Sequence, residues 1–262
     1  MMRSLWTAGS GMVAQQANID VISNNLANVN TTGFKKIRAD FQDLIYQTIR
    51  QAGATSGPDN ILPTGVQMGH GARLVATQHI FTTGNFQATG NPLDVAIEGD
   101  GFLQITMPDG TLGYTRDGSL KKDAQGRLVT SEGYFLEPQI TIPQTATAVT
   151  ISGEGLVSAT IPGQATPQEL GQIQLARFVN PSGMDSIGRN LFKENNASGP
   201  AIVSNPGTDG AGTIVQNYLE MSNVQVVEEM VNMIIAQRAY EMNAKAVTTS
   251  DEMLSTANQM KR

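Results

Sequence analysis

The C-terminal segment Ser222–Arg262 reads SNVQVVEEMVNMIIAQRAYEMNAKAVTTSDEMLSTANQMKR and decides how the rest of the chain is interpreted. It contains no Gly or Pro from Val224 onward, and its apolar and small residues recur at steps of three and four. That spacing is typical of one face of an α-helix and not of a strand. The stripe consists of Val227, Val231, Ile235, Ala239, Met242, Ala246, Thr249, Met253, Ala257 and Met260. The sequence therefore predicts a long helix, with Lys261 and Arg262 at the negative end of its dipole.

The N-terminal segment carries a second stripe with the same spacing. It consists of Leu5, Ala8, Met12, Gln15, Ile19, Ile22, Leu26 and Val29. Gly9, Ser10 and Gly11 place flexible residues in this segment, so we expect the regular helix from Met12 onward. Stripes at both ends of the chain predict that the two terminal helices pair side by side as a coiled-coil-like layer. The alternative is an ordinary two-helix hairpin that closes a globular domain.

Both stripes are rich in Ala, Met, Val and Ile, and the Ala positions bury little area in each turn. A lone helix pair of this kind would be marginal, because helices gain most of their stability from tertiary packing. We therefore expect the terminal helices to be ordered by packing against other copies of the chain. The candidate assembly interface consists of Met12, Ile19, Ile22, Leu26, Val227, Val231, Ile235, Ala239, Met242, Ala246 and Met253.

The middle of the chain changes character twice. Ile37, Phe41, Leu44 and Ile45 suggest a short helix that ends near Arg50. The segment from 51 to 71 is dense in Gly, Pro, Ser and Thr and predicts an extended loop without a core of its own. From 72 to 179 apolar residues alternate with polar ones between turn signals, which predicts short strands. The segment from 180 to 212 returns to loop composition.

These patterns predict an α+β chain of several domains, in which a mostly-β domain of sandwich or barrel-like type is inserted between the terminal helices. We expect a helical assembly domain at 1–33 and 222–262, connecting segments at 34–71 and 180–221, and the β domain at 72–179. The large core residues expected in the β domain are Phe102, Tyr114, Tyr134, Phe135 and Phe178.

Composition excludes several classes of function. The net charge is −6 and the chain has no Lys/Arg cluster, so we expect no binding to nucleic acid. There is no cysteine, which excludes disulfides and thiolate metal sites. No apolar run approaches the length of a membrane span, so no membrane insertion is expected. The N-terminus also lacks the apolar core of a Sec-type signal peptide.

The residues offer no complete catalytic, cofactor or metal site. His70 and His79 are not accompanied by acidic residues at the spacing of metal ligands. The glycine-rich stretches EGDGF from Glu98 and DGAGT from Asp209 do not match a phosphate-binding loop. Asp94 and Glu98 could serve a hydrolase acting on a glycan such as peptidoglycan, but strand alternation is expected to place both on the solvent-facing side. Since no nucleophile, base and orienting group can be combined, we predict that the chain is not an enzyme and needs no cofactor.

Several stretches resemble the axial proteins of the bacterial flagellum, the family of rod and hook subunits. They are SLWTAGSGMVAQQANIDVISNNLANVNTTGFKK from Ser4, NPLDVAIEGDGFLQI from Asn91, GYTRDGSL from Gly113 and VVEEMVNMIIAQRAYEMNAKAVTTSDEML from Val226. The resemblance runs along essentially the whole chain. The SLW start, YQTIRQAGA with the 51–71 loop, and SNVQVVEEMVNMI favour a subunit of the distal rod over one of the proximal rod or the hook.

The resemblance implies a structural subunit that self-assembles into a rigid helical tube, transmits torque from motor to hook and carries the export channel. Its implied partners are further copies of itself, the proximal rod and hook proteins, the surrounding P- and L-rings, and the flagellar type III export apparatus. Export through that apparatus implies a location from the periplasm to the outer membrane without a cleavable signal peptide. In this family a loop comparable to the one near 46–71 is associated with a straight, rigid rod.

A second class of function stays open at this stage. The chain could be a secreted module that binds a glycan or a cell surface through its β domain and oligomerises through helical stalks. That reading predicts a compact aromatic patch on the β domain, whereas the chain has five Tyr and a single Trp, which lies in the N-terminal helix.

Overall fold

The computed structural model describes residues 2–53, 55–57, 60–61, 63–163 and 166–260, so the predicted charges at Lys261 and Arg262 lie outside the described residues. The chain divides into two compact units. Unit 1 contains Met1–Leu26, Ile37–Gln78 and Val226–Arg262, and unit 2 contains Ala27–Lys36 and His79–Gln225.

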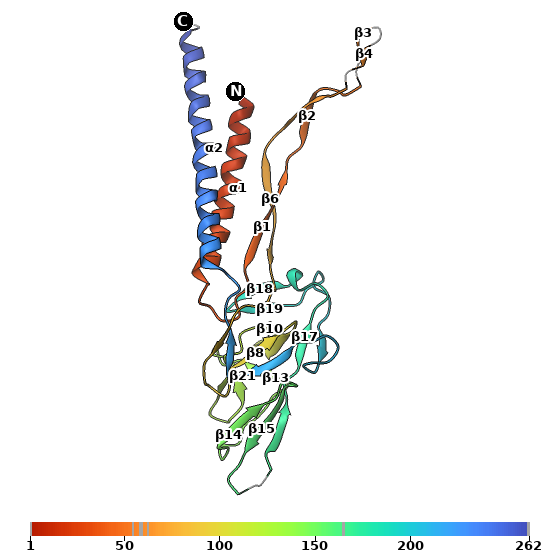
Figure 1. Ribbon diagram of the computed structural model, residues 1–262, viewed down its shortest axis with the longest axis vertical. Coiled ribbons are helices and arrows are strands. Elements are labelled where there is room, and N and C mark those ends of the chain that lie inside the picture. The colour runs from red at the N-terminus through yellow and green to blue at the C-terminus, as the bar shows by residue number, and fades with distance from the viewer. Residues whose placement is uncertain (1, 54, 58–59, 62, 164–165, 261–262) are drawn as a thin grey trace. The chain divides into compact units, whose positions relative to one another are not determined.

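Unit 1 consists of the terminal helices and a two-stranded arm (Figure 1). Its elements are α1 (Met2–Ala27), β1 (Ile37–Asp43), β2 (Tyr46–Arg50), β3 (Thr55–Gly57), β4 (Asn60–Ile61), β5 (Val66–Gly69), β6 (Ala72–His79) and α2 (Val226–Met260). The prediction of helices at both ends of the chain is confirmed. α1 runs through Gly9–Gly11, so the expectation of a regular helix only from Met12 is wrong.

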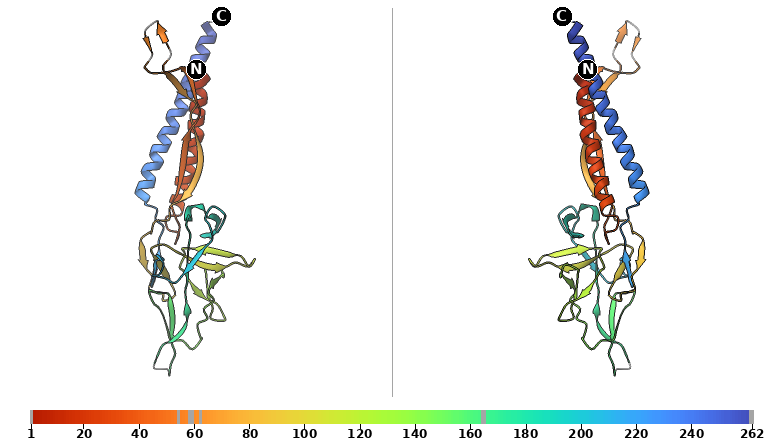
Figure 2. Two further views of the ribbon diagram at one scale, coloured as in Figure 1. Left: turned by 90° about the vertical axis from the view of Figure 1, so that its right-hand side faces the viewer. Right: turned by 90° about the vertical axis from the view of Figure 1, so that its left-hand side faces the viewer.

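The two helices lie side by side and run antiparallel, as Figures 1 and 2 show. Ser4 Oγ lies 3.2 Å from Ser250 Oγ, and Asn25 Nδ2 donates to Glu229 Oε2 over 3.1 Å. Between these contacts Gly11 faces Asn243, whose Nδ2 would lie 2.9 Å from a Cβ at that position. Gly11 is therefore used for close approach of the helices, which explains why a glycine is tolerated inside α1.

The region that follows α1 corrects two expectations. The predicted helix from Ile37 to Arg50 is wrong, because this segment forms β1 and β2. The predicted loop from 51 to 71 contains β3, β4 and β5 among its described residues. β1 pairs with β6, β2 with β5 and β3 with β4, so the whole segment forms one long arm. Pairing with a strand distant in sequence outweighs the helical spacing of a few apolar residues.

Unit 2 is mostly β, which confirms the coarse prediction for the middle of the chain. Its elements are β7 (Phe86–Ala88), β8 (Val95–Glu98), β9 (Phe102–Thr106), β10 (Leu112–Thr115), β11 (Lys121–Lys122), β12 (Leu128–Val129), β13 (Phe135–Glu137), β14 (Ala148–Ile151), β15 (Leu156–Thr160), β16 (Gln168–Gln172), β17 (Leu175–Arg177), the 3-10 helix η1 (Pro181–Gly183), β18 (Asp185–Gly188), β19 (Leu191–Lys193), β20 (Ile202–Ser204), β21 (Thr213–Gln216) and β22 (Tyr218–Glu220).

The unit differs from the expected β domain at both boundaries. β6 belongs to the arm of unit 1, and the segment from 180 to 221, expected as a connector, supplies β18 to β22. The composition of residues 180–221 did not indicate these strands, because each strand has only three or four residues and lies between Gly-rich turns.

The main sheet of unit 2 has nine strands. Seven follow the order β11-β12-β13-β9-β10-β19-β18, while β17 pairs with β9 and with β20. A three-stranded sheet β14-β15-β16 and the pairs β21-β8 and β22-β7 complete the unit. β9 lies at the centre of the main sheet, and its residues from Phe102 to Ile105 are all buried, so both faces of this strand are covered.

The core of unit 2 has an aliphatic and an aromatic part. The aliphatic part surrounds Leu103, Leu136 and Leu175, each completely buried. The aromatic part consists of Phe102, Tyr114, Ala176, Phe178, Met184 and Phe192. Three of the five expected aromatic core residues lie there. Tyr134 and Phe135 are only half-buried, and Phe192 was missed because it lies in the segment read as loop.

A buried charge cluster joins the two segments through which the chain enters and leaves unit 2. The Glu220 carboxylate accepts hydrogen bonds from Lys35 Nζ at 2.5 Å, Arg116 Nη1 at 3.4 Å and the Gly84 amide at 2.9 Å. Asn223 links the same segments, since it accepts from the Lys36 amide and donates to the Ile80 carbonyl. Burial lowers the pKa of Lys35, while the charge of Glu220 acts in the opposite direction.

No helix within the described ranges has both the length and the apolar character needed to cross a membrane.

Candidate assembly interface

The predicted stripe of α2 lies on the exposed side of the helix. Val227 is 76% exposed, Ile235 61% and Met242 70%, whereas Val231 and Met253 are about half exposed. Ala246 is exposed and Ala239 is half-buried. Large apolar side chains with this exposure leave half or more of their surface in water. The structure therefore presents the α2 part of the candidate interface as free surface.

The opposite side of α2 faces into unit 1. Glu229, Ala236 and Ser250 are the buried residues of this helix. At about 100° per residue, Ala236 points roughly 180° away from Val227. Asn25, which is buried in α1, donates to both Glu229 Oε2 and the carbonyl of Ile37 and accepts from the Ile37 amide. The contact between the two helices is thus made largely by small and polar side chains. The apolar stripe of α2 lies beside this contact, with Ile235 about 100° from Ala236 around the helix, and is opposite to it at Val227.

The α1 part of the candidate interface is less accessible. Met12, Ile19 and Leu26 are half-buried, and Ile22 is 5% exposed. Ile22 therefore stabilises the packing of α1 inside unit 1 and is not available to another molecule in this conformation.

Sequence reasoning missed four exposed apolar residues next to the stripes. Trp6 and Val13 project from α1 with about seven-tenths of each side chain exposed, and Met230 and Ile234 lie beside Val227 and Val231 on α2. The signal for Met230 and Ile234 was present, because they repeat the three-four spacing one position away from the stripe. Trp6 and Val13 are seven residues apart, one heptad, and could have been found in the same way.

A shallow groove marks the second half of the α2 stripe. Its volume is about 410 Å³, and it is lined by Met242, Lys245, Ala246, Thr249, Ser250 and Met253. The alternation of large Met and small Ala or Ser side chains creates the hollow. A knob from a neighbouring helix can enter a hole of this kind.

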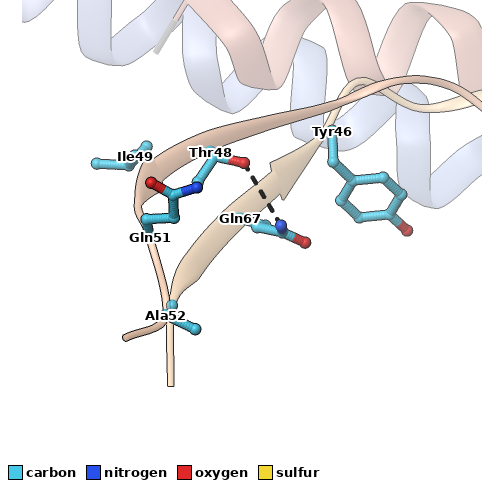
Figure 3. A pocket seen from close by; sticks show the side chains of 7 residues that line it. Tyr46, Thr48, Ile49, Gln51, Ala52 and Gln67 are labelled. Carbon is cyan, nitrogen blue, oxygen red and sulfur yellow. Dashed lines mark hydrogen bonds between the residues drawn. The ribbon is translucent and has the colours of Figure 1, made fainter. Parts of the chain in front are cut away.

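The arm of unit 1 is a second exposed apolar surface. All residues of β2 and β5 are exposed, including Tyr46, Ile49, Val66 and Met68, and Ile45 between β1 and β2 is 84% exposed. An open groove of about 960 Å³ is lined by residues of β2 and β5 and by Gln51, Ala52 and Gly65 (Figure 3). Tyr46 and Ile49 belong to its lining, and Gln67 donates to the Thr48 hydroxyl over 3.4 Å.

The arm is held against α1 at a few points. Arg3 donates to Gln47 Oε1 and, over 3.4 Å, to Met68 Sδ. Gly71, with φ +114°, lies so close to Ser10 that a Cβ there would overlap the hydroxyl. These contacts position the middle of the arm but leave its apolar side chains uncovered.

Asp94, Glu98 and His79, the residues considered for other chemistry, belong to unit 2. Asp94 is buried and accepts from Asn91 Nδ2 at 2.8 Å, so the expectation that it faces solvent is wrong, whereas Glu98 is exposed as predicted. His79 packs edge-on against Phe192, with centroids 5.3 Å apart, and its Nδ1 lies 3.3 Å from the Lys35 carbonyl. Burial lowers the pKa of His79, and the bond to Lys35 opposes that shift.

Three models of flagellar protein families match the chain. "Flagella basal body rod protein" matches residues 5–35, "Flagellar hook protein FlgE/F/G D1 domain" matches residues 96–159, and "Flagellar basal body rod FlgEFG protein C-terminal" matches residues 215–260. The first and last coincide with most of α1 and α2, and the second lies in unit 2.

Individual relatives agree over the full length. The chain is 56% identical to the flagellar basal-body rod protein FlgG of Borreliella burgdorferi, with both chains covered completely. It is 51% identical to FlgG of Caulobacter vibrioides, over 99% of this chain and all of the relative, and 43% identical to FlgG of Bacillus subtilis over both whole chains. The resemblance read from the sequence is confirmed, and the chain belongs to the FlgG family of flagellar basal-body rod proteins.

Proposed function

We propose that this chain is a non-enzymatic structural subunit of the distal rod in the flagellar basal body, where copies assemble into a rigid helical tube. The observation that carries the proposal is the apolar stripe of α2, which is exposed and lies outside the contact with α1. Contiguous apolar patches that a protein exposes to solvent commonly mark sites of interaction with other proteins. Burying this stripe between copies would contribute about 25 cal/mol for each Å² removed from water.

The proposed contact joins α2 residues of one copy to terminal-helix residues of the next. It comprises Val227, Val231, Ile235, Ala239, Met242, Ala246 and Met253 of α2, with Met12, Ile19 and Leu26 of α1 and with Ile22 as internal support. Neighbouring helices would then complete the coiled-coil-like layer, and 1–33 with 222–262 would act as the assembly domain. Contacts between two different surfaces that do not close into a ring generate an open helical tube.

The arm would stiffen this tube. An isolated two-stranded ribbon is marginally stable in water. The exposed apolar residues of β2 and β5 would stabilise the arm if a neighbouring subunit covered them. In unit 2, the nine-stranded and three-stranded sheets share one aliphatic core, which supports a sandwich- or barrel-like arrangement.

The same family resemblance supports the partners and the location. The subunit would join proximal rod and hook proteins, lie within the P- and L-rings between periplasm and outer membrane, carry the export channel, and transmit torque. It would leave the cytoplasm through the flagellar type III apparatus without a cleavable signal peptide. No cofactor, nucleic acid or membrane insertion is needed for this role.

Hydrogen exchange on the purified monomer and on assembled rods tests the proposal. We expect amides of 226–260 and of the arm to exchange rapidly in the monomer and to become protected in the rods, because assembly supplies their packing. The amides of β9 and β13 should be protected in both states and serve as the internal control. Strong protection of α2 in the monomer that does not increase on assembly would contradict the proposal.

A further inference from the structure

Unit 2 contains a pocket that the proposed assembly surface does not use. Its volume is about 420 Å³, within the range of about 300–1,000 Å³ usual for binding sites. Three aromatic rings, Phe81, Phe102 and Phe178, form its apolar wall, and the polar groups around it are Arg116, Arg177 and Asp100. All of these residues belong to unit 2.

The apolar wall is rigid. Phe102 makes edge-on contacts with Phe81, at 5.2 Å between ring centroids, and with Phe178, at 5.8 Å. The guanidinium of Arg116 lies over the Phe102 ring, with Cζ 5.2 Å from the centroid. A ligand would therefore meet aromatic rings held in place by each other and by a cation, so little side-chain ordering is needed on binding.

The charges around the pocket favour an anion. Three cations, Arg116, Arg177 and Lys35, face two carboxylates, those of Glu220 and Asp100. Arg116 and Lys35 share the Glu220 carboxylate, and the side chains of these three residues are almost completely buried. Arg116 Nη1 reaches Glu220 over 3.4 Å and Nη2 donates to the Gly99 carbonyl at 2.8 Å, but its buried Nε has no hydrogen-bond partner within the described part of the chain. A buried donor without a partner costs free energy, and a guanidinium prefers a carboxylate.

A free sheet edge lies one strand beyond β17, whose Arg177 lines the pocket. β20 pairs with β17 and with no other described strand, and Ile202 of β20 lies opposite Arg177. Ile202 and Val203 are about half exposed, and Val179 at the border of the pocket is 82% exposed. An extended peptide can pair with such an edge through its main chain while its side chains enter neighbouring pockets.

We propose that this pocket and the β20 edge bind an extended segment of another protein chain, one that carries a carboxylate next to a large apolar side chain. The apolar side chain lies on the three phenylalanines, and the peptide main chain follows β20. The carboxylate pairs with Arg177, whose Nη1 also donates to the Asp209 carbonyl, and it balances the surplus of one positive charge around the pocket. The free edge selects a peptide over a small carboxylic acid. This site does not depend on the proposed role in the rod.

Chemical-shift titration of the isotope-labelled full chain tests the proposal. The probes are the capped peptide acetyl-TVDLVT-amide, its uncharged counterpart acetyl-TVNLVT-amide, and 4-phenylbutanoate as a small carboxylate. We expect the acidic peptide to shift the amides of Phe178, Val179 and Ile202 and to bind roughly tenfold more tightly than the uncharged one, because charge-assisted hydrogen bonds are about twice as strong as neutral ones.

Surface variants separate binding from folding. Arg177→Gln should weaken the acidic peptide by roughly tenfold, and Asp100→Asn should strengthen it because a repelling carboxylate is removed. Arg189→Gln, at an exposed arginine of unit 2 that does not line the pocket, should leave binding unchanged. Equal binding of the two peptides, or shifts that avoid the pocket, would overturn the proposal. If 4-phenylbutanoate binds as tightly as the acidic peptide, the site takes small carboxylates and the role assigned to β20 is wrong.

Discussion

The two units of this chain use their apolar residues in opposite ways. In unit 2 most large apolar residues lie inside, around Leu103, Leu136 and Leu175, and exposed ones such as Val179 are exceptions. The buried charges of Lys35, Arg116 and Glu220 pair within the same unit. In unit 1 the largest apolar side chains of α2 and of the arm are exposed, while Glu229 and Ser250 are buried between the helices. Unit 2 contains what a stable domain needs, whereas unit 1 has a surface that only another molecule can complete.

This difference teaches that amphipathic spacing locates an apolar face but does not say what covers it. The stripe on α2 was read correctly as a helical face, yet the chain's own α1 does not cover it. One unit of a single chain can therefore leave an apolar face exposed that other subunits cover in the assembly.

The largest effect is expected from charges on the exposed face of α2. Val231→Asp combined with Ile235→Asp should abolish assembly, because two carboxylates would have to be buried without partners. Unit 2 should stay folded, since neither residue belongs to it. Pelleting and electron microscopy report assembly, and thermal melting of the β signal reports unit 2.

Ser255→Asp is the matched control, because it adds a carboxylate at an exposed position of α2 outside the stripe. It should assemble like the unaltered chain. Rods formed by the double variant would remove the basis for the proposed interface, and loss of the β signal would show that the two units are not independent.

The next largest effect concerns the charge cluster of unit 2. Glu220→Ala should destabilise this unit by about 3–5 kcal/mol, since Lys35 and Arg116 would remain buried without their shared carboxylate. Glu220→Gln keeps the shape and an acceptor and should cost less. Urea unfolding followed by β-sheet circular dichroism measures both. A loss within about 0.5 kcal/mol for the Ala variant, the range of ordinary surface changes, would refute the assigned role.

A pair of equal truncations sharpens the comparison of the units. Leu136→Ala, at a completely buried position, should cost about 2–5 kcal/mol of unfolding free energy in the monomer. Met242→Ala, at a position 70% exposed, should change it by no more than about 0.5 kcal/mol. In assembled rods Met242→Ala should lower the stability of the polymer, although it leaves the stability of the monomer nearly unchanged. If Met242→Ala destabilises the monomer as strongly as Leu136→Ala, α2 is covered within the chain.

Much of this fold could be predicted from local patterns. The helices follow from long three-four spacing without Gly or Pro, and the strands from 95 to 177 follow from alternation between strong turn signals. The arm could not be predicted, because β1 and β2 owe their structure to β6 and β5, and such pairing leaves no local signal at Ile37 or Phe41.

The candidate interface was predicted by position but not by exposure. Spacing found Val227, Val231 and Met242, but it did not reveal that Ile22, on the corresponding stripe of α1, is buried inside the chain. It also gave no hint of the Glu220 cluster, because Lys35, Arg116 and Glu220 are far apart in sequence and only the fold brings their charges together.

The smallest expected effect is a pH dependence confined to unit 2. His79 is partly buried beside Phe192, and burial lowers its pKa below the value of about 6.5 that it has in an unfolded chain. Below pH 6.5 the unfolded chain therefore takes up a proton that the folded chain does not. The stability of unit 2 should be full above about pH 6.5 and should decrease as the pH falls, with a slope of at most about 1.4 kcal/mol per pH unit.

His79→Gln should remove this contribution. The difference in unfolding free energy between the unaltered chain and the His79→Gln variant should therefore change from pH 7.5 to pH 5.5 and be constant above pH 7.5. This range spans about one pH unit on either side of the ordinary pKa of histidine. Carboxylates that titrate in the same range cancel in the difference. The measurement belongs in the Val231→Asp, Ile235→Asp background, where assembly cannot add stability to the folded state. Parallel pH profiles of the two proteins would mean that His79 takes up a proton as readily in the folded chain as in the unfolded one. The aromatic core of unit 2 would then be less closed than the contrast with unit 1 requires.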